Sequence, residues 1–72
     1  MNKKNVEPES DFPTGISNPA RRALAGAGYT HLVQLTHVTE ADLLKLHGVG
    51  PKAVRLIREA LGAKGWSFAQ EG

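Results

Sequence analysis

Apolar residues recur at helical spacing from residue 19 to residue 61, and Gly, Pro and Thr residues divide them into short segments. A first helix is expected over about 19–27, capped by Asn18, with Pro19 at its first position and Gly28 as a left-handed C-terminal cap. The same signals predict three further helices: 31–35 capped by Thr30, 39–46 entered through Thr39 and Asp42, and 51 to about 61, begun by Pro51 and ended by Gly62 or Gly65.

The apolar stripes of these helices predict the core. No stretch of four or more residues alternates between apolar and polar positions, so strands are not indicated. The expected fold is all-α, a compact bundle of four to five helices. Its predicted core residues are Ala20, Ala23, Leu24, Ala27, Leu32, Val33, Leu35, Leu43, Leu44, Leu46, Ala53, Val54, Ile57, Ala60 and Leu61, with Trp66 and Phe68 folding back onto them.

Size and composition restrict the function. Residues 1–13 are polar and contain two prolines, so they are expected to form a disordered tail, and residues 14–72 a single domain. A chain of 72 residues without cysteine has neither disulfides nor Cys-bound zinc, and it is too small for a deep catalytic pocket. We therefore expect no enzyme. No signal peptide or spanning segment is visible, which predicts a cytoplasmic protein that does not enter a membrane.

The net charge of +2 is unevenly distributed. Residues 1–13 carry two bases and three acids, whereas residues 14–70 carry seven bases and three acids. A basic domain is a possible electrostatic footprint for a polyanion such as nucleic acid, although ordinary solvated helix faces look the same.

The most informative segment is 43–57, where two predicted helices meet at the sequence Gly-Val-Gly-Pro. Gly48 and Gly50 let the backbone turn sharply, and Val49 between them is expected to anchor the turn in the core. Without side chains at positions 48 and 50, a phosphate oxygen could approach the backbone amides directly. Lys52 and Arg55 would place positive charge beside it, at the positive end of the last helix's dipole. The alternative is a helix C-cap followed by a helix that begins with proline.

This segment resembles a helix-hairpin-helix motif: Gly-hydrophobic-Gly within an apolar frame, then Lys52 and the small Ala53. The resemblance implies binding of the DNA sugar-phosphate backbone without strong sequence choice. Some turns of this type also hold a monovalent cation, which the sequence neither requires nor excludes; no other cofactor is expected. When the sequence is aligned with itself at an offset of 22 residues, the segment 24–28 matches 46–50, which indicates a degenerate internal repeat. We expect the second copy to bind the anion and the first copy to support the fold.

From Ile16 to Phe68 the chain resembles the C-terminal domain of the bacterial RNA polymerase alpha subunit. The similarity lies in the helix spacing, in Thr-Glu-Ala-Asp-Leu-Leu, in the turn 50–52 and in Gly-Trp-Ser-Phe. It implies a domain that meets the minor groove and adjacent phosphates, with Arg22, Gly50 and Lys52 at positions that touch DNA in that family. The family's principal DNA-contacting arginine falls at Pro19, and the serine after the turn lysine is Ala53. A free-standing DNA-binding protein or a domain of a larger one is expected.

The sequence thus predicts a monomeric, non-enzymatic protein that binds duplex DNA. The alternative is a protein-docking or self-association module that uses Leu56 as a partly exposed contact. The histidines lack the spacing of a helical zinc site, and no nucleophile lies beside a base, so neither metal ligands nor catalytic residues are expected. The predicted DNA-binding residues are Gly48, Val49, Gly50, Lys52, Ala53, Arg55, Arg21 and Arg22.

Overall fold

The computed structural model describes residues 10–70, which form three α-helices and one 3-10 helix and, within that range, no strand. In chain order the elements are α1 (Asn18–Gly26), the 3-10 helix η1 (Leu32–His37), α2 (Glu40–Leu44) and α3 (Pro51–Ala63). The all-α class is confirmed, and the chain after α3 is extended rather than a fifth helix. None of the helices in the described part is long and apolar enough to cross a membrane.

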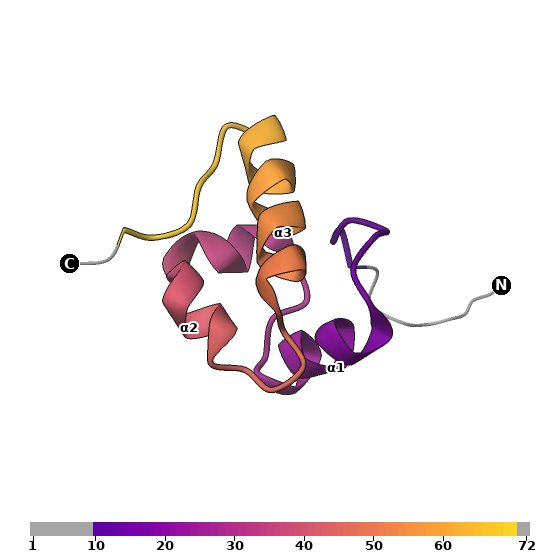
Figure 1. The fold of residues 1–72 in the computed structure, drawn as a ribbon. Helices are drawn as coiled ribbons and strands as arrows, with labels where there is room; N and C mark the ends of the chain where they lie inside the picture. Colours follow the sequence, from indigo (N-terminus) through magenta and orange to yellow (C-terminus); the bar gives the residue numbers. More distant parts are fainter. Residues whose placement is uncertain (1–9, 71–72) are drawn as a thin grey trace, which may run out of the picture.

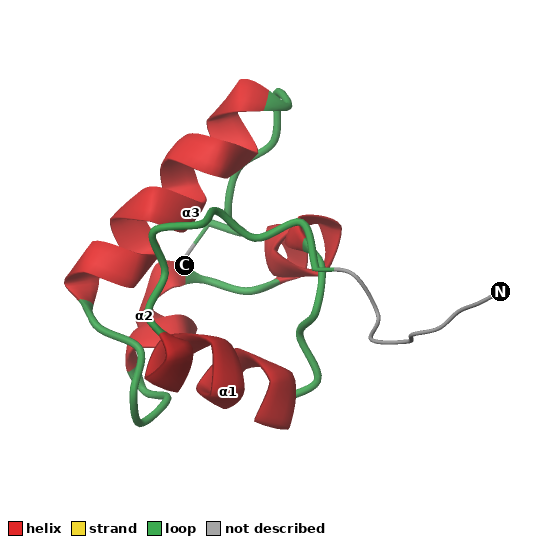
Figure 2. Cartoon of the chain, turned by 90° about the vertical axis from the view of Figure 1, so that its right-hand side faces the viewer, coloured by secondary structure: helices red, strands yellow, loops and turns green. Residues whose placement is uncertain are grey.

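The longest helix, α3, organises the arrangement. It packs against η1 and α2, and α1 lies across its N-terminal end, as Figures 1 and 2 show from two sides. The core draws on every helix and on both flanking segments. Its buried residues are Phe12, Ile16, Ala20, Leu24, Leu32, Leu35, Leu43, Val49, Ala53, Val54, Ile57, Leu61 and Phe68.

The helix ends follow local side-chain chemistry. Ser17, rather than Asn18, caps α1, because its Oγ accepts a hydrogen bond from the amide of Ala20 at 3.3 Å. Thr39 caps α2 as predicted, with its Oγ1 accepting from the amide of Asp42 at 3.0 Å. At the other end of α1, Gly28 adopts φ 94°. The left-handed cap predicted there is confirmed.

The second element is a 3-10 helix and begins later than predicted. Gln34 turns its side chain back on the chain before it, where its Oε1 accepts from the amides of Thr30 at 2.7 Å and His31 at 2.8 Å. The side chain of Asp11 accepts from the amide of Leu32 at 2.7 Å. The start of η1 is therefore held by Gln34 and Asp11, not by the predicted Thr30 cap.

The boundary of the folded domain lies earlier than residue 14. Phe12 is buried in the core, and Asp11 bonds to η1 across the chain, so residues 10–13 belong to the domain. The polar composition of this segment is typical of a disordered tail, but the burial of one aromatic side chain in the core is enough to fix the segment to the domain. The remainder of the predicted tail, residues 1–9, lies outside the described residues.

Four predicted core residues are exposed. Ala27 is the C-cap of α1, and Val33 and Leu44 are about half exposed. Trp66 is 38% exposed, with the Nζ of Lys64 5.6 Å from its ring centroid. Phe68 is buried as predicted, and the amide of Ala69 donates to the carbonyl oxygen of Val38 at 2.9 Å. The C-terminal segment therefore closes the core through Phe68, not through Trp66.

The predicted internal repeat is not reflected in the backbone. Its register pairs Gly26 with Gly48, but Gly26 is the last residue of α1 and helical, whereas Gly48 adopts a left-handed conformation. Gly28, paired with Gly50, is left-handed, and Gly50 is extended. The two glycine pairs therefore form different turns.

Candidate nucleic-acid interface

The turn between α2 and α3 is anchored from inside. Val49 is buried, as predicted, and its amide donates to the carbonyl oxygen of Leu46 at 3.1 Å. Gly48 before it has φ 102°, a conformation that favours glycine. Gly50 after it is extended, with φ −110°, and precedes the first residue of α3. The two glycines therefore have different backbone conformations, left-handed at Gly48 and extended at Gly50.

Gly48 lets the turn approach α1. A Cβ atom at this position would lie 3.0 Å from the carbonyl oxygen of Pro19 and 3.6 Å from the Cβ of Ala23. A Cβ at Gly50 would meet no atom within 4 Å. A side chain at position 48 would therefore press on α1, whereas a side chain at position 50 would point into open space. Both glycines line the pocket described below, and that a phosphate approaches their backbone stays a prediction.

The N-terminus of α3 has no side-chain cap. Gly50 supplies no capping atom, the first turn contains no acidic residue, and the first bond of the helix runs from the amide of Val54 to the carbonyl oxygen of Gly50 at 3.1 Å. Pro51 has no N–H, so the amides of Lys52 and Ala53 are the donors left at this end. These two amides lie at the positive end of the helix dipole, where a bound anion is stabilised.

A pocket of about 220 Å³ lies at this helix end. One wall comes from the segment before α1 and from its first turn, and the other from the α2–α3 turn and the start of α3. The lining residues are Gly15, Ile16, Ser17, Ala20, Gly48, Gly50, Lys52 and Ala53. The structure thereby brings together four of the predicted site residues from the turn with the beginning of α1.

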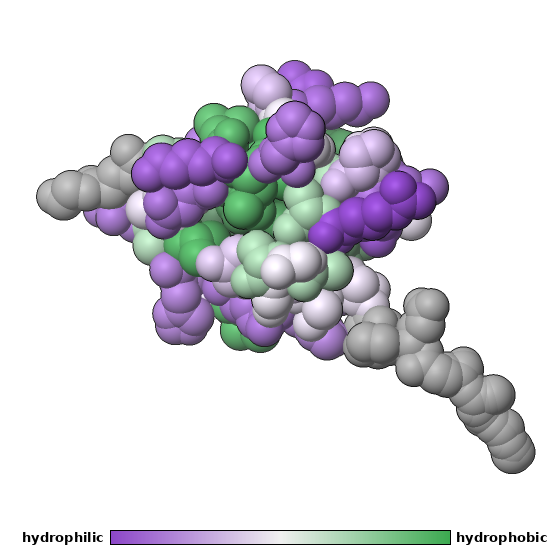
Figure 3. Space-filling model, turned by 90° about the horizontal axis from the view of Figure 1, so that it is seen from below, coloured by the Kyte–Doolittle hydropathy of each residue, from purple (hydrophilic) through white to green (hydrophobic). Residues whose placement is uncertain are grey.

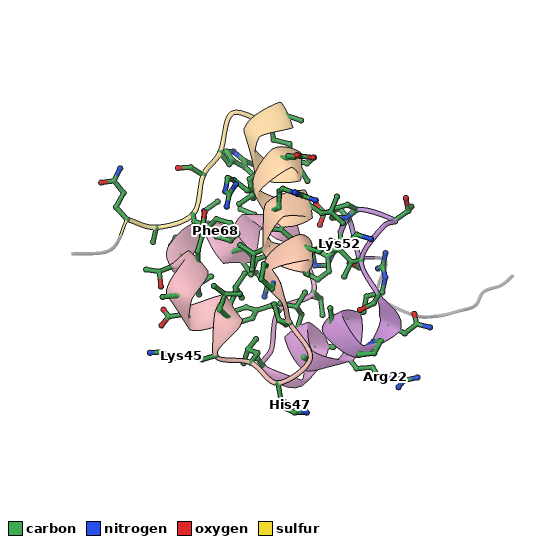
Figure 4. All side chains as sticks on the ribbon, viewed as in Figure 1. Arg22, Lys45, His47, Lys52 and Phe68 are labelled. Carbon is green, nitrogen blue, oxygen red and sulfur yellow. The ribbon has the colours of Figure 1, made fainter. Side chains whose placement is uncertain are left out.

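The basic residues of α1 and α3 differ in their exposure and in whether they have an acidic partner, and Lys52 is the one that lines the pocket. Arg22, Lys52 and Arg55 are exposed, and in residues 10–70 none of them is paired with an acid. In Figure 4, Lys52 lies beside α3 in the right half of the view and Arg22 below α1 in the same half, whereas Lys45 and Phe68 lie in the left half. Seen from below, hydrophilic side chains border a band of apolar and neutral surface (Figure 3).

Arg58, the third base along α3, is already engaged. Its Nε and Nη2 donate to the two carboxylate oxygens of Glu40 at 2.8 and 3.2 Å, which ties α3 to α2. These hydrogen bonds lower the pKa of Glu40 and raise that of Arg58. Arg58 therefore contributes less free positive charge than the sequence suggests.

Two of the predicted contact residues have structural partners. Arg21 is half-buried, and its guanidinium donates to the carbonyl oxygens of Pro13 at 2.8 Å and Ile16 at 3.3 Å. Leu56 is also half-buried and packs against the core, and a Cβ at Gly15 would lie 3.1 Å from its Cδ1. The guanidinium of Arg21 is therefore held by backbone carbonyls, whereas Leu56 is partly exposed, as predicted.

Gly15, Ile16 and Ser17 line the pocket but are absent from the predicted site residues. Serine is a preferred N-cap residue, so the sequence offers Ser17 as well as Asn18 for the start of α1, but nothing in it places residues 15–17 at the turn. The part of the chain that the structure describes contains no group of three His, Cys, Asp or Glu residues that could hold a metal. Comparisons with protein-family models, with curated proteins and with solved structures found no match.

Proposed function

We propose that this protein binds the sugar-phosphate backbone of duplex DNA, largely without sequence specificity, through a turn of the helix-hairpin-helix type. The observation that carries the proposal is the uncapped start of α3, which opens beside Lys52 into a pocket shared with the start of α1. Amide donors and a lysine at one helix end suit a phosphate oxygen.

The number of free bases sets the expected strength. Lys52 sits at the pocket, and the exposed Arg22 and Arg55 follow on α1 and α3. If these neutralise about three phosphates, the logarithm of the binding constant should fall against the logarithm of the salt concentration with a slope of about −3. A dissociation constant of about 10⁻⁴ to 10⁻⁶ M is typical of such non-specific complexes.

The resemblance to the polymerase alpha C-terminal domain supports the same surface, because Arg22, Gly50 and Lys52 correspond to its DNA-contacting positions. Pro19 replaces the main arginine of that family, so the proposal includes no preference for A·T-rich grooves. The docking alternative depends on Leu56 as a partly exposed contact, and the side chain is indeed partly exposed. We favour DNA binding because the uncapped start of α3 beside Lys52 suits an anion rather than an apolar partner.

The test is a titration of a fluorescent duplex of about 20 base pairs, followed by anisotropy at low and moderate salt, with a scrambled duplex alongside. We expect both duplexes to bind equally and to be released by salt. Lys52→Glu should abolish binding, and the matched variant Lys45→Glu, at a residue that does not line the pocket, should bind almost as well as the wild type. No binding at low salt, or equal losses in both variants, would overturn the proposal.

A further inference from the structure

The two adjacent arginines of α1 have different surroundings. Arg22 is exposed, whereas Arg21 is half-buried and bonds to two carbonyl oxygens of the preceding segment. A guanidinium presents its donors in one fixed plane, so a single side chain can hold two backbone carbonyls in register. The ammonium of a lysine has no such geometry.

The segment that Arg21 holds is a wall of the pocket. Gly15, Ile16 and Ser17 line the pocket opposite Gly50 and Lys52. Residues 13–16 form a turn, in which the amide of Ile16 donates to the carbonyl oxygen of Pro13 at 3.4 Å. The guanidinium of Arg21 donates to the carbonyl oxygens at both ends of this turn, those of Pro13 and Ile16. The shape of that wall therefore depends on the guanidinium.

We propose that Arg21 is a positioning residue for DNA binding: it fixes the segment 13–16 as one wall of the pocket and does not itself contact phosphate. This inference rests on the proposed function. Replacing Arg21 should weaken binding without changing the number of phosphates that are neutralised, whereas replacing Arg22 should remove one of them.

The neighbouring arginines provide matched variants. Affinity for the duplex would be measured across a range of salt for Arg21→Lys, Arg21→Gln, Arg22→Lys and Arg22→Gln. We expect Arg21→Lys to bind several-fold more weakly than wild type although its charge is kept, with an unchanged salt slope. Arg22→Lys keeps the charge of a phosphate contact, so its salt slope should stay at the wild-type value, and Arg22→Gln should reduce the magnitude of the slope by about 0.9.

A second readout reports on the wall directly. In the absence of DNA, Arg21→Lys should shift the amide NMR signals of Gly15, Ile16 and Ser17, and Arg22→Lys should leave them in place. A general loss of stability would lower the melting temperature, but it would not reduce the affinity of the folded protein well below that temperature. If Arg21→Gln fails to fold, Arg21→Lys still decides the question, because it keeps the charge and the aliphatic stem.

Three results would overturn the inference. Wild-type affinity in Arg21→Lys would show that the wall does not depend on the guanidinium fork. A slope reduced equally in Arg21→Gln and Arg22→Gln would make Arg21 a phosphate contact. A wild-type protein that binds no duplex would overturn the proposed function itself, and this inference with it, before any variant is compared.

Discussion

Gly48 and Pro19 meet at the contact between the α2–α3 turn and α1: a Cβ built on Gly48 would lie 3.0 Å from the carbonyl oxygen of Pro19. The turn therefore rests on the backbone of α1, with no side chain between them. This close approach brings the first turn of α1 to the uncapped end of α3, so one glycine determines how the two walls of the pocket meet.

Gly48→Ala should destabilise the fold. The left-handed backbone at φ 102° costs a residue with a side chain about 1–3 kcal/mol, and contact with the Pro19 carbonyl adds to this cost. Gly50→Ala is the matched control, because its φ of −110° suits any residue and its Cβ would meet open space. Its free energy of unfolding should change by less than about 1 kcal/mol. Urea denaturation measures both, and equal losses would contradict the assignment of Gly48 to packing.

Phe12→Ala should cost about 3–5 kcal/mol, as expected for a large aromatic side chain removed from a core. Trp66→Ala should cost less than about 1 kcal/mol, because the indole is 38% exposed and contacts a lysine. Thermal unfolding of the two variants compares them directly. A larger loss for Trp66→Ala would reverse the roles that the structure gives to these two residues.

These two aromatic residues show where the sequence is a poor guide. The amide of Trp66 donates to the carbonyl oxygen of Leu61 at 2.9 Å and completes the C-terminal turn of α3. The path after this turn leaves Trp66 exposed and brings Phe68 inward. Phe12 fills the core from a segment that looks like a tail. Both outcomes depend on contacts between distant parts of the chain, which local composition does not encode.

Features that depend only on neighbouring residues in the sequence could be predicted. The buried Val49, the proline that begins α3 and the left-handed Gly28 each follow from residue type and position alone. The position of the exposed Lys52 beside the turn likewise follows from the sequence, because it comes two residues after Gly50. The roles of Arg21 and Arg22 could not be separated, because adjacent arginines look the same in a sequence and differ only in which carbonyl groups the fold brings near them.

Arg55→Gln should reduce the magnitude of the salt slope of DNA binding by about 0.9 and leave the stability unchanged, because its guanidinium is exposed and unpaired in the described part of the chain. Arg58→Gln, three residues later, should leave the slope unchanged and lower the stability, since it breaks the bonds to Glu40. Anisotropy and urea denaturation measure the two effects separately. An equal change of slope in both variants would contradict this division.

The ion pair between Glu40 and Arg58 predicts a pH dependence. The hydrogen bonds from Arg58 lower the pKa of Glu40 from its ordinary value of 4.5. A carboxylate whose pKa is lower in the folded state stabilises the fold above its unfolded pKa, and this stabilisation is lost as the pH falls through the folded pKa. The wild type should therefore be more stable than Glu40→Gln at neutral pH, by a small amount for so exposed a pair.

The difference between wild type and Glu40→Gln should disappear as the pH falls below 4.5. Chemical denaturation of both proteins from pH 3 to pH 7 measures it, with pH values chosen around the ordinary range of carboxylates. A difference that stays constant over this range would show that the carboxylate contributes nothing through its charge.

The most direct test of the central claim is an amide NMR titration of the labelled protein with a short DNA duplex at low salt. If phosphate binds at the start of α3, the largest shifts will fall on the amides of Lys52 and Ala53, with smaller shifts at Gly50, Ser17 and Arg22. Shifts centred on α2 and residues 66–70, or no shift at any residue, would contradict the account.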